Sequence, residues 1–392
     1  MPGPIQDLLL FLKRSHGRRL VLFGTGPSAA HHLSQLPLPS PVFAVDNDSA
    51  RWGGAFEGIP VHPPAALSKE TRGELFVVVA SIAVEEISAQ LEAMGFQAGI
   101  DYSVSPFLER RPGEVFDSLP PLLVSCLGHG GGLYRIDPCS GRSALVIEGD
   151  FRGLAVHPEG FLAVHEHEGL QLLDRDLNLI RKAAAPDRLN LHGAAVDPER
   201  GRIYVNETAL DRVGIYHADR LTRCGELIPP PAAHAGVDLR HINDLALADG
   251  HLWLSMFSYE GVWRDRSWND GTILRMPVDG EGVARLVHRG LRQPHSLLFS
   301  GGRLFCCNSL ECTVLQDGDP LFTVNGYTRG LASVGGVFVV GQSRVRRLSR
   351  FPAHLRALSL DCGLHLWDPE SRATRFVPVP AEGVFAILPL AP

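Results

Sequence analysis

The chain has 392 residues, of which 45% are hydrophobic and 20% are charged, and its formal net charge is -6. This length favours two domains, and the composition is typical of a soluble globular protein rather than a disordered or fibrous one. The negative charge gives no reason to expect a nucleic-acid partner, because such proteins carry a basic stripe. We expect no membrane partner either, since no apolar run of 18 or more residues occurs.

Cysteine usage and the start of the chain indicate the compartment. The seven cysteines show no paired spacing, which suits a reducing environment. The short apolar patch near the N-terminus follows Asp7 and precedes the basic residues, which is the wrong order for a secretory signal. We therefore expect a cytoplasmic protein.

The first hundred residues contain a glycine pattern that is typical of nucleotide-binding folds. An apolar run over 19–23 is followed directly by Gly-x-Gly-x-x-Ala and then by a helical pattern. The first glycine permits a tight turn and the second lets a phosphate approach the backbone. A second apolar run over 42–45 ends in an aspartate, where such folds hold an acid for the ribose hydroxyls. The predicted nucleotide or NAD(P) site therefore consists of Gly24, Gly26, Ala29 and Asp46.

A third predicted strand over 75–80 and a helix over about 84–94 complete a small Rossmann-like parallel α/β domain at residues 1–112. The phrases FGTGPSA, FAVDND and GIPVHPPAAL resemble the N-terminal domain of bacterial polysaccharide-biosynthesis proteins, including sugar acetyltransferases of the PglD kind. The resemblance implies a domain that holds a nucleotide sugar, holds a dinucleotide, or serves only as a scaffold.

Residues 116–392 are predicted to form a β-propeller. A polar residue, usually followed by a small residue and then an apolar run, recurs at 34- to 54-residue intervals, at 152–156, 192–196, 243–247, 295–299, 329–333 and 383–387. Such repeats, built of short strands and Gly-rich turns, indicate a radial β array. We predict six blades, with the C-terminal strand closing the blade that begins at 122–148. Seven blades would require a further repeat within 344–382.

A propeller directs the start of every innermost strand toward one central channel, so the polar residues there are expected to converge. They are Arg152, His192, His241, Asn243, His295, Arg329 and Glu382.

Three imidazoles at adjacent strand starts can hold a divalent transition metal such as Zn, Fe, Mn or Ni. The predicted ligands are His192, His241 and His295. Arg152 and Arg329 are predicted to clamp the carboxylate or phosphate of a small anionic substrate, with Glu382 or Asp244 as the general base. A metal-free acid/base site and a hydrogen-bonded plug of the axis remain alternatives.

Two loops near the channel mouth offer further candidates. Tyr259, Trp263 and Trp268 belong to a long loop and either stack on a substrate or pack the loop onto its blade; Tyr259 is our aromatic candidate for catalysis. Arginines also cluster in a short run, which is either a solvated loop face or an anion clamp at the mouth. They are Arg344, Arg346, Arg347 and Arg350.

The propeller half also resembles a conserved bacterial family of presumed β-propellers, DUF4915. The matching phrases are His241-Ile-Asn-Asp, Pro294-His-Ser, Gly326-Tyr-Thr-Arg-Gly-Leu and Val340-Gly-Gln-Ser-Arg. The resemblance implies the fold and the place of the site, but no reaction.

Three functions follow from these patterns. The first is a biosynthetic enzyme whose channel performs lyase, isomerase or hydrolase chemistry on a small anionic substrate. The second is a non-catalytic propeller that binds a glycan or a protein beside a vestigial Rossmann scaffold. The third is an NAD(P)-linked oxidoreductase. Association into a homo-oligomer stays open.

Overall fold

The structure is a computed structural model, and it describes residues 11–35, 40–106, 113–186, 188–230, 236–265 and 269–390. The chain divides into two compact units, Met1–Pro112 and Gly113–Pro392. Each unit is described by itself. Among the described residues, no helix has the length and apolar character needed to cross a bilayer.

The first unit is built around a six-stranded sheet with the order β3-β4-β2-β1-β5-β6. Its strands are β1(Arg19–Phe23), β2(Phe43–Val45), β3(Ala55–Phe56), β4(Ile59–His62), β5(Leu75–Val79) and β6(Tyr102–Val104). The pairs from β4 to β6 are parallel and only β3 is antiparallel to its neighbour. The named α-helices are α2(Pro27–Gln35) and α3(Val84–Ala93).

The central strands of this sheet are apolar because both faces are covered. Along β1 and β5, Val21 and Val77 belong to one buried cluster, whereas Leu22 and Phe76 belong to another. Continuous apolar runs are typical of such parallel strands. The strands predicted over 19–23, 42–45 and 75–80 and the helix over 84–94 are confirmed to within about one residue at each end. Since strands outnumber helices in this unit, the finer assignment as a Rossmann-like domain stays a prediction.

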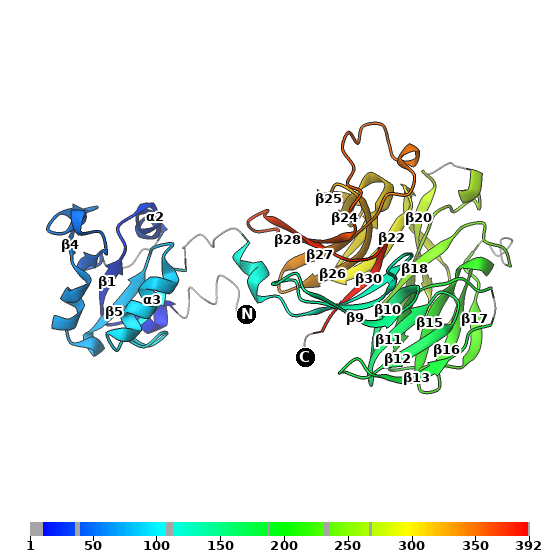
Figure 1. Ribbon diagram of the computed structural model, residues 1–392, viewed down its shortest axis with the longest axis horizontal. Helices are drawn as coiled ribbons and strands as arrows, with labels where there is room; N and C mark the ends of the chain where they lie inside the picture. The colour runs from blue at the N-terminus through cyan, green and yellow to red at the C-terminus, as the bar shows by residue number, and fades with distance from the viewer. Residues whose placement is uncertain are drawn as a thin grey trace. The chain divides into compact units, whose positions relative to one another are not determined.

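The second unit is a six-bladed β-propeller, in which each blade is a four-stranded antiparallel sheet (Figure 1). Blade 1 contains β10(Phe151–His157), β11(Gly160–His165), β12(Gly169–Leu173) and β13(Leu179–Ala183). Blade 2 contains β14(Leu191–Asp197), β15(Arg202–Glu207), β16(Arg212–His217) and β17(Arg223–Leu227). Blade 3 contains β18(Ile242–Ala248), β19(His251–Met256), β20(Gly271–Pro277) and β21(Arg285–Leu291).

Blade 4 contains β22(Pro294–Ser300), β23(Arg303–Asn308), β24(Thr313–Gln316) and β25(Asp319–Thr323). Blade 5 contains β26(Tyr327–Val334), β27(Val337–Ser343), β28(Gly363–Trp367) and β29(Thr374–Pro378). Blade 6 contains β30(Gly383–Pro389), β7(Leu122–Leu127), β8(Gly132–Ile136) and β9(Ser143–Glu148). The short 3-10 helices are η1(Ser49–Arg51), η2(Pro64–Lys69), η3(Arg72–Glu74), η4(Glu114–Ser118), η5(Thr208–Leu210), η7(Trp263–Asp265), η8(Ser309–Glu311) and η9(Leu348–Arg350).

The ring is closed by the last strand, as the sequence predicts. Strand β30 pairs antiparallel with β7, from Gly383 opposite Leu127 to Pro389 opposite Leu122. This pairing gives the C-terminal strand a partner from the start of the propeller and removes a free sheet edge. The alternative of seven blades is wrong, because residues 344–362 lie as a loop between β27 and β28.

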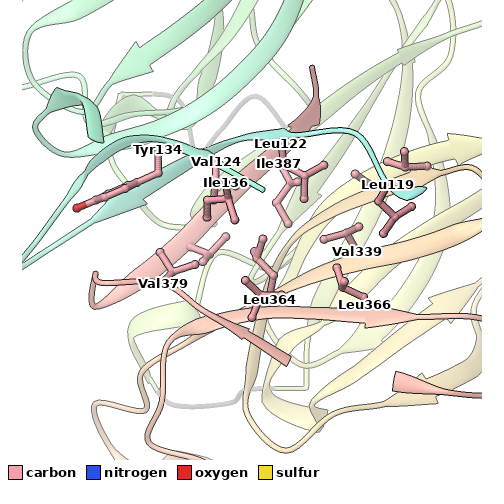
Figure 2. Packing of buried hydrophobic residues seen from close by; sticks show 14 of the residues in the cluster. Leu119, Leu122, Val124, Tyr134, Ile136, Val339, Leu364, Leu366, Val379 and Ile387 are labelled. Carbon is pink, nitrogen blue, oxygen red and sulfur yellow. The ribbon is translucent and has the colours of Figure 1, made fainter. Parts of the chain in front are cut away.

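The closing blade is held to blade 5 by a buried apolar cluster (Figure 2). Val124 and Ile136 of blade 6 pack in this cluster with Val339 and Leu364 of blade 5, and Ile387 of β30 joins them. All five side chains are at most 3% exposed. Because alternate residues of a strand face opposite sides, each blade presents an apolar face to its neighbour.

Ile387→Ala should destabilise the propeller by about 2–5 kcal/mol, because the substitution leaves a cavity at the closing blade. Urea unfolding of the full chain, followed by far-UV circular dichroism, measures the change. The matched control is Val283→Ala at a side chain that is 80% exposed, which should change stability by less than about 0.5 kcal/mol. Equal effects of the two substitutions would contradict this account of ring closure.

Candidate functional site in the propeller channel

Every innermost strand has a β-bulge near its start. The register shifts fall between Phe151 and Leu154, Leu191 and Ala194, Ile242 and Asp244, His295 and Leu298, Arg329 and Leu331, and Val384 and Ala386. Bulges bend a strand and redirect its side chains. The repeated phrase of the sequence thus marks the bulge.

The small residue of the phrase is explained by close packing between neighbouring bulges. A Cβ atom on Gly153 would lie 2.6 Å from the carbonyl oxygen of His192. On Gly193 it would collide with the carboxylate of Asp244. Side chains larger than hydrogen would therefore push adjacent inner strands apart.

Asp244 connects the bulges of two blades. Its Oδ2 accepts a hydrogen bond of 3.1 Å from the backbone N–H of Leu297, and the neighbouring Asn243 donates to the carbonyl of Pro294 at 2.9 Å. Asp244 lines a cavity of about 310 Å³, which we call the lower cavity. Arg329 and Glu382 line a different cavity, which we call the upper cavity. Asp244 therefore makes a contact between blades 3 and 4. It lines a different cavity from Arg329 and Glu382, so it does not lie beside them as the predicted general base would.

The ring of Phe385, in blade 6, contacts side chains from four other blades. Its centroid lies 5.5 Å from the ring of His192, 6.2 Å from the ring of His295, and 5.5 Å from the guanidinium carbons of both Arg152 and Arg329. Phe385 itself is 3% exposed. Four of the predicted polar side chains thus converge, but on an aromatic ring that sequence reasoning missed.

His192 and His295 are neutral bases held by their own backbone. Nδ1 of His192 lies 2.9 Å from the carbonyl of Asn190, and Nδ1 of His295 lies 3.0 Å from that of Gln293. A carbonyl oxygen only accepts, so each Nδ1 carries the proton and each Nε2 keeps its lone pair. Burial, followed by the nearby guanidinium groups of Arg152 and Arg329, lowers the pKa of both rings well below its usual range.

The three predicted metal ligands do not form a metal site. His241 lies edge-on to His192 at 5.3 Å between ring centroids, whereas Phe385 contacts both His192 and His295. Across the described ranges, no group of three or more His, Cys, Asp or Glu side chains is placed to hold a metal ion. The ring of Phe385 contacts both His192 and His295, which hinders a shared ligand between these two imidazoles.

The two predicted clamp arginines differ in their partners. Arg152 is paired with Glu166, with 2.5 Å between Nη2 and Oε2, and their side chains are 14% and 15% exposed. Burial lowers the pKa of Arg152, and Glu166 partly offsets that effect. Arg329 has no carboxylate partner among the described residues, and its buried Nε has no hydrogen-bond partner there. Arg329 is therefore the inner cation with a charge available to a ligand.

The upper cavity has a volume of about 340 Å³ and is strongly basic. Five arginines and one glutamate are among the residues that line it, namely Arg329, Arg344, Arg346, Arg347, Arg350 and Glu382. Glu382 is 34% exposed and its Oε2 lies 3.7 Å from Nη2 of Arg346. The arginine run therefore lines the mouth of the channel, and Glu382 can balance only part of its charge.

His241 lines the same cavity and is tightly held. Its ring lies 4.5 Å from the rings of both Phe257 and Trp263. Its Nδ1 is 3.3 Å from each carboxylate oxygen of Asp238, a residue that sequence reasoning missed. The spacing Asp-x-x-His was the available signal, but such a spacing is common and gives little specificity. His241 also has a φ of 55°, which is uncommon for a residue other than glycine.

The aromatic loop divides between two places. Trp263 lines the upper cavity, whereas Tyr259 is absent from its lining and lies under the guanidinium of Arg289, with its ring centroid 5.5 Å from that carbon. Tyr259 also packs against the apolar cluster of blade 3. These contacts agree with the alternative in which Tyr259 packs the loop onto its blade, and the catalytic role of Tyr259 stays a prediction. Trp268 lies outside the described residues.

The predicted nucleotide residues of the first unit make contacts within the unit. Gly24 has a φ of 104°, and a Cβ there would lie 3.0 Å from the carbonyl oxygen of Ala80. Gly26 begins α2, because its carbonyl accepts from the N–H of Ala29 at 3.0 Å, and Ala29 is fully buried.

Asp46 is occupied by its own chain. Its Oδ2 accepts from the backbone N–H and the hydroxyl of Thr25, at 2.8 and 2.5 Å, and its Oδ1 accepts from the N–H of Asp48 at 2.8 Å. Nη1 of Arg51 lies 3.8 Å from Oδ2. Both carboxylate oxygens are therefore engaged before any ribose could bind.

Comparison with known proteins identifies the family. A family model described as a domain of unknown function, DUF4915, matches residues 176–377. The chain belongs to the DUF4915 family. The match does not include the first unit, so its resemblance to polysaccharide-biosynthesis proteins stays a prediction. No curated protein matches the chain.

Solved structures resemble this DUF4915 protein at low identity. A protein of unknown function from Bacteroides caccae is 13% identical, with a TM-score of 0.49, and the match covers 69% of this chain and 99% of that one. A chain of a nidogen/laminin complex is 13% identical with a TM-score of 0.48, covering 68% and 97%. The calcium-binding protein regucalcin from Agrobacterium tumefaciens is 11% identical with a TM-score of 0.43, covering 60% and 76%.

Asp244 should make the stability of the propeller depend on pH. Burial raises the pKa of Asp244 from 3.8 to about 7. The folded state therefore binds this proton more tightly than the unfolded chain, and the free energy of unfolding falls as pH rises from about 4 to about 7. Because water can reach the lower cavity, we expect the fall to be smaller than the limit of about 1.4 kcal/mol per pH unit.

Asp244→Asn should remove this fall while keeping a carbonyl acceptor for Leu297. Urea unfolding at several pH values between 4 and 8 measures it. Asp317→Asn, at a carboxylate that Arg303 contacts on the surface, serves as a control that should retain the fall. An unchanged pH dependence in Asp244→Asn would show that the carboxyl does not titrate as described.

Proposed function

We propose that the propeller of this DUF4915 protein binds a small anionic molecule in its upper channel cavity. The observation that carries the proposal is the imbalance of charge in the lining, where Arg329, Arg344, Arg346 and Arg347 face one glutamate in a chain whose net charge is -6. Like charges held together repel each other, so the cavity favours a ligand that neutralises them. Guanidinium groups bind carboxylate and phosphate oxygens in a bidentate manner.

The size and lining of the cavity support a small molecule over a glycan. A volume of about 340 Å³ lies within the range of small-molecule sites. The rings of Phe257 and Trp263 already pack on His241 at 4.5 Å, which leaves them poorly placed to stack on a sugar. The alternative of a non-catalytic glycan-binding propeller is therefore less favoured.

A second candidate function is acid/base chemistry on the bound anion. The pair of Asp238 and His241 favours it, because His241 lines the cavity and its Nδ1 faces the carboxylate. An imidazole oriented in this way presents Nε2 as a general base. Such chemistry is that of an isomerase or a lyase, which retains the hypothesis of a biosynthetic enzyme without requiring a metal.

For the first unit we propose a Rossmann-like scaffold. The parallel strands and the glycine turn before α2 favour that fold. The engaged carboxylate of Asp46 favours a scaffold over a nucleotide site, and it disfavours the alternative of an NAD(P)-linked oxidoreductase.

Inorganic pyrophosphate should bind the full chain and should bind less tightly as salt concentration rises, because screening weakens attraction to exposed arginines. The double substitution Arg346→Gln, Arg347→Gln should weaken binding at least about tenfold, since each lost charged hydrogen bond is worth about 1.5–3 kcal/mol. Isothermal titration calorimetry measures both effects.

The matched control is Arg303→Gln, at an arginine that is 63% exposed and paired with Asp317 outside the cavity. It should leave the affinity unchanged. Absence of pyrophosphate binding, or an equal loss in the control and the loop variant, would refute the proposed function.

A further inference from the structure

We infer that the ligand of the upper cavity carries two anionic groups, an inner carboxylate that binds Arg329 and an outer phosphate that binds the arginine loop. This inference rests on the proposed function and specifies its ligand class. The loop consists of residues 344–350, which follow β27.

The inner position is a set of buried and half-buried donors beside the ring of Phe385. The guanidinium carbon of Arg329 lies 5.5 Å from the ring centroid of Phe385 and 4.9 Å from that of Tyr327. The Tyr327 hydroxyl donates to Oε1 of Gln293 at 2.8 Å, which leaves the amide NH₂ of Gln293 as a further donor in the cavity lining. Two adjacent donors, one of them charged, suit a carboxylate.

The inner position also lacks a competing negative charge. Among the described residues, Arg329 has no ion pair, and the glutamate of the cavity lies near the mouth, where it approaches Arg346. Gln293 is 4% exposed, and the hydrogen bond that its Oε1 accepts from the Tyr327 hydroxyl fixes the orientation of its amide. Arg329 is half-buried and its buried Nε has no hydrogen-bond partner among the described residues, so a bound carboxylate would compensate its charge.

The outer position is different in character because its arginines are exposed. Arg344, Arg346 and Arg347 are all exposed, and Arg346 is the one that approaches Glu382. Several exposed guanidinium groups suit a phosphate, which offers three oxygens and up to two negative charges.

The loop is nevertheless tied to the channel wall. The backbone N–H of Arg344 donates to the carbonyl of Glu382 at 2.8 Å, and the ring of Phe351 lies 6.1 Å from that of Tyr327. Both positions therefore border one continuous cavity. A single anion would leave one set of arginines uncompensated, whereas a molecule with anions at both ends neutralises both.

The test compares two probes that differ at one end. In 3-phosphoglycerate a carboxylate stands where glycerol 3-phosphate has a neutral CH₂OH group, and both carry the phosphate. Calorimetry on the full chain should show 3-phosphoglycerate binding at least about tenfold more tightly, because the carboxylate gains charged hydrogen bonds from Arg329.

Arg329→Gln should abolish this preference, because it should weaken binding of 3-phosphoglycerate at least about tenfold more than binding of glycerol 3-phosphate. The double substitution Arg346→Gln, Arg347→Gln should weaken both probes by similar factors. The preference is a ratio of two affinities measured on the same variant, so the test stands even where Arg329→Gln lowers the melting temperature.

The outcomes separate the two proposals. Equal binding of the two probes by the wild-type chain, or an undiminished preference in Arg329→Gln, overturns the two-anion ligand while the proposed anion site stands. Failure of both probes and of pyrophosphate to bind overturns the proposed function itself.

Discussion

The pairing of β30 with β7 is the constraint on which the rest of the propeller depends. It joins residues 122–127 to residues 383–389 and so turns five blades and a fragment into a closed ring. Loop-closure entropy opposes bringing together such distant segments, and the buried cluster around Val124, Leu364 and Ile387 offsets that cost. Without closure, the six inner strands would have no common axis.

A common axis brings polar groups from different blades within reach of one another, and this closeness has two consequences. Backbone groups freed by the bulges must be satisfied across blades, which is the role of Asp244 toward Leu297 and of Ser296 toward Gly330. Cations also accumulate, and the chain compensates them unequally. Arg152 has Glu166, whereas Arg329 faces the upper cavity without a carboxylate. That difference distinguishes the arginine that is paired within blade 1 from the one that we propose binds the ligand.

Much of this fold could be predicted from the sequence, because its periodicity reports the repeating blades directly. The closing strand could be predicted because the strands at 122–148 come before the first copy of the repeated phrase and lack an innermost strand of their own. The placement of His241, Arg329 and Glu382 at the upper cavity follows from their positions at or just before strand starts. Phe385 was missed because the prediction considered only polar residues at strand starts, whereas Phe385 is an apolar residue at the bulge of β30. Only the observed register shift reveals it.

Contacts between blades are the part that sequence alone could not give. Asp238 and Gln293 lie just before strand starts, but their roles depend on partners that loops bring close, such as Trp263 and Tyr327. Tyr259 and Trp263 belong to one loop, and its path sends one ring toward Arg289 and the other toward the cavity. From the sequence alone, the arginine run at 344–350 fits either a solvated loop face or an anion clamp, and only its place in the cavity lining favours the second.

A crystal structure of the full chain grown with 3-phosphoglycerate tests the central claim most directly. The account predicts ligand density in the upper cavity, with the carboxylate within hydrogen-bond distance of the guanidinium of Arg329 and the phosphate against the loop at 344–350. An empty cavity at saturating ligand, or density confined to the outer surface of the blades, would contradict it.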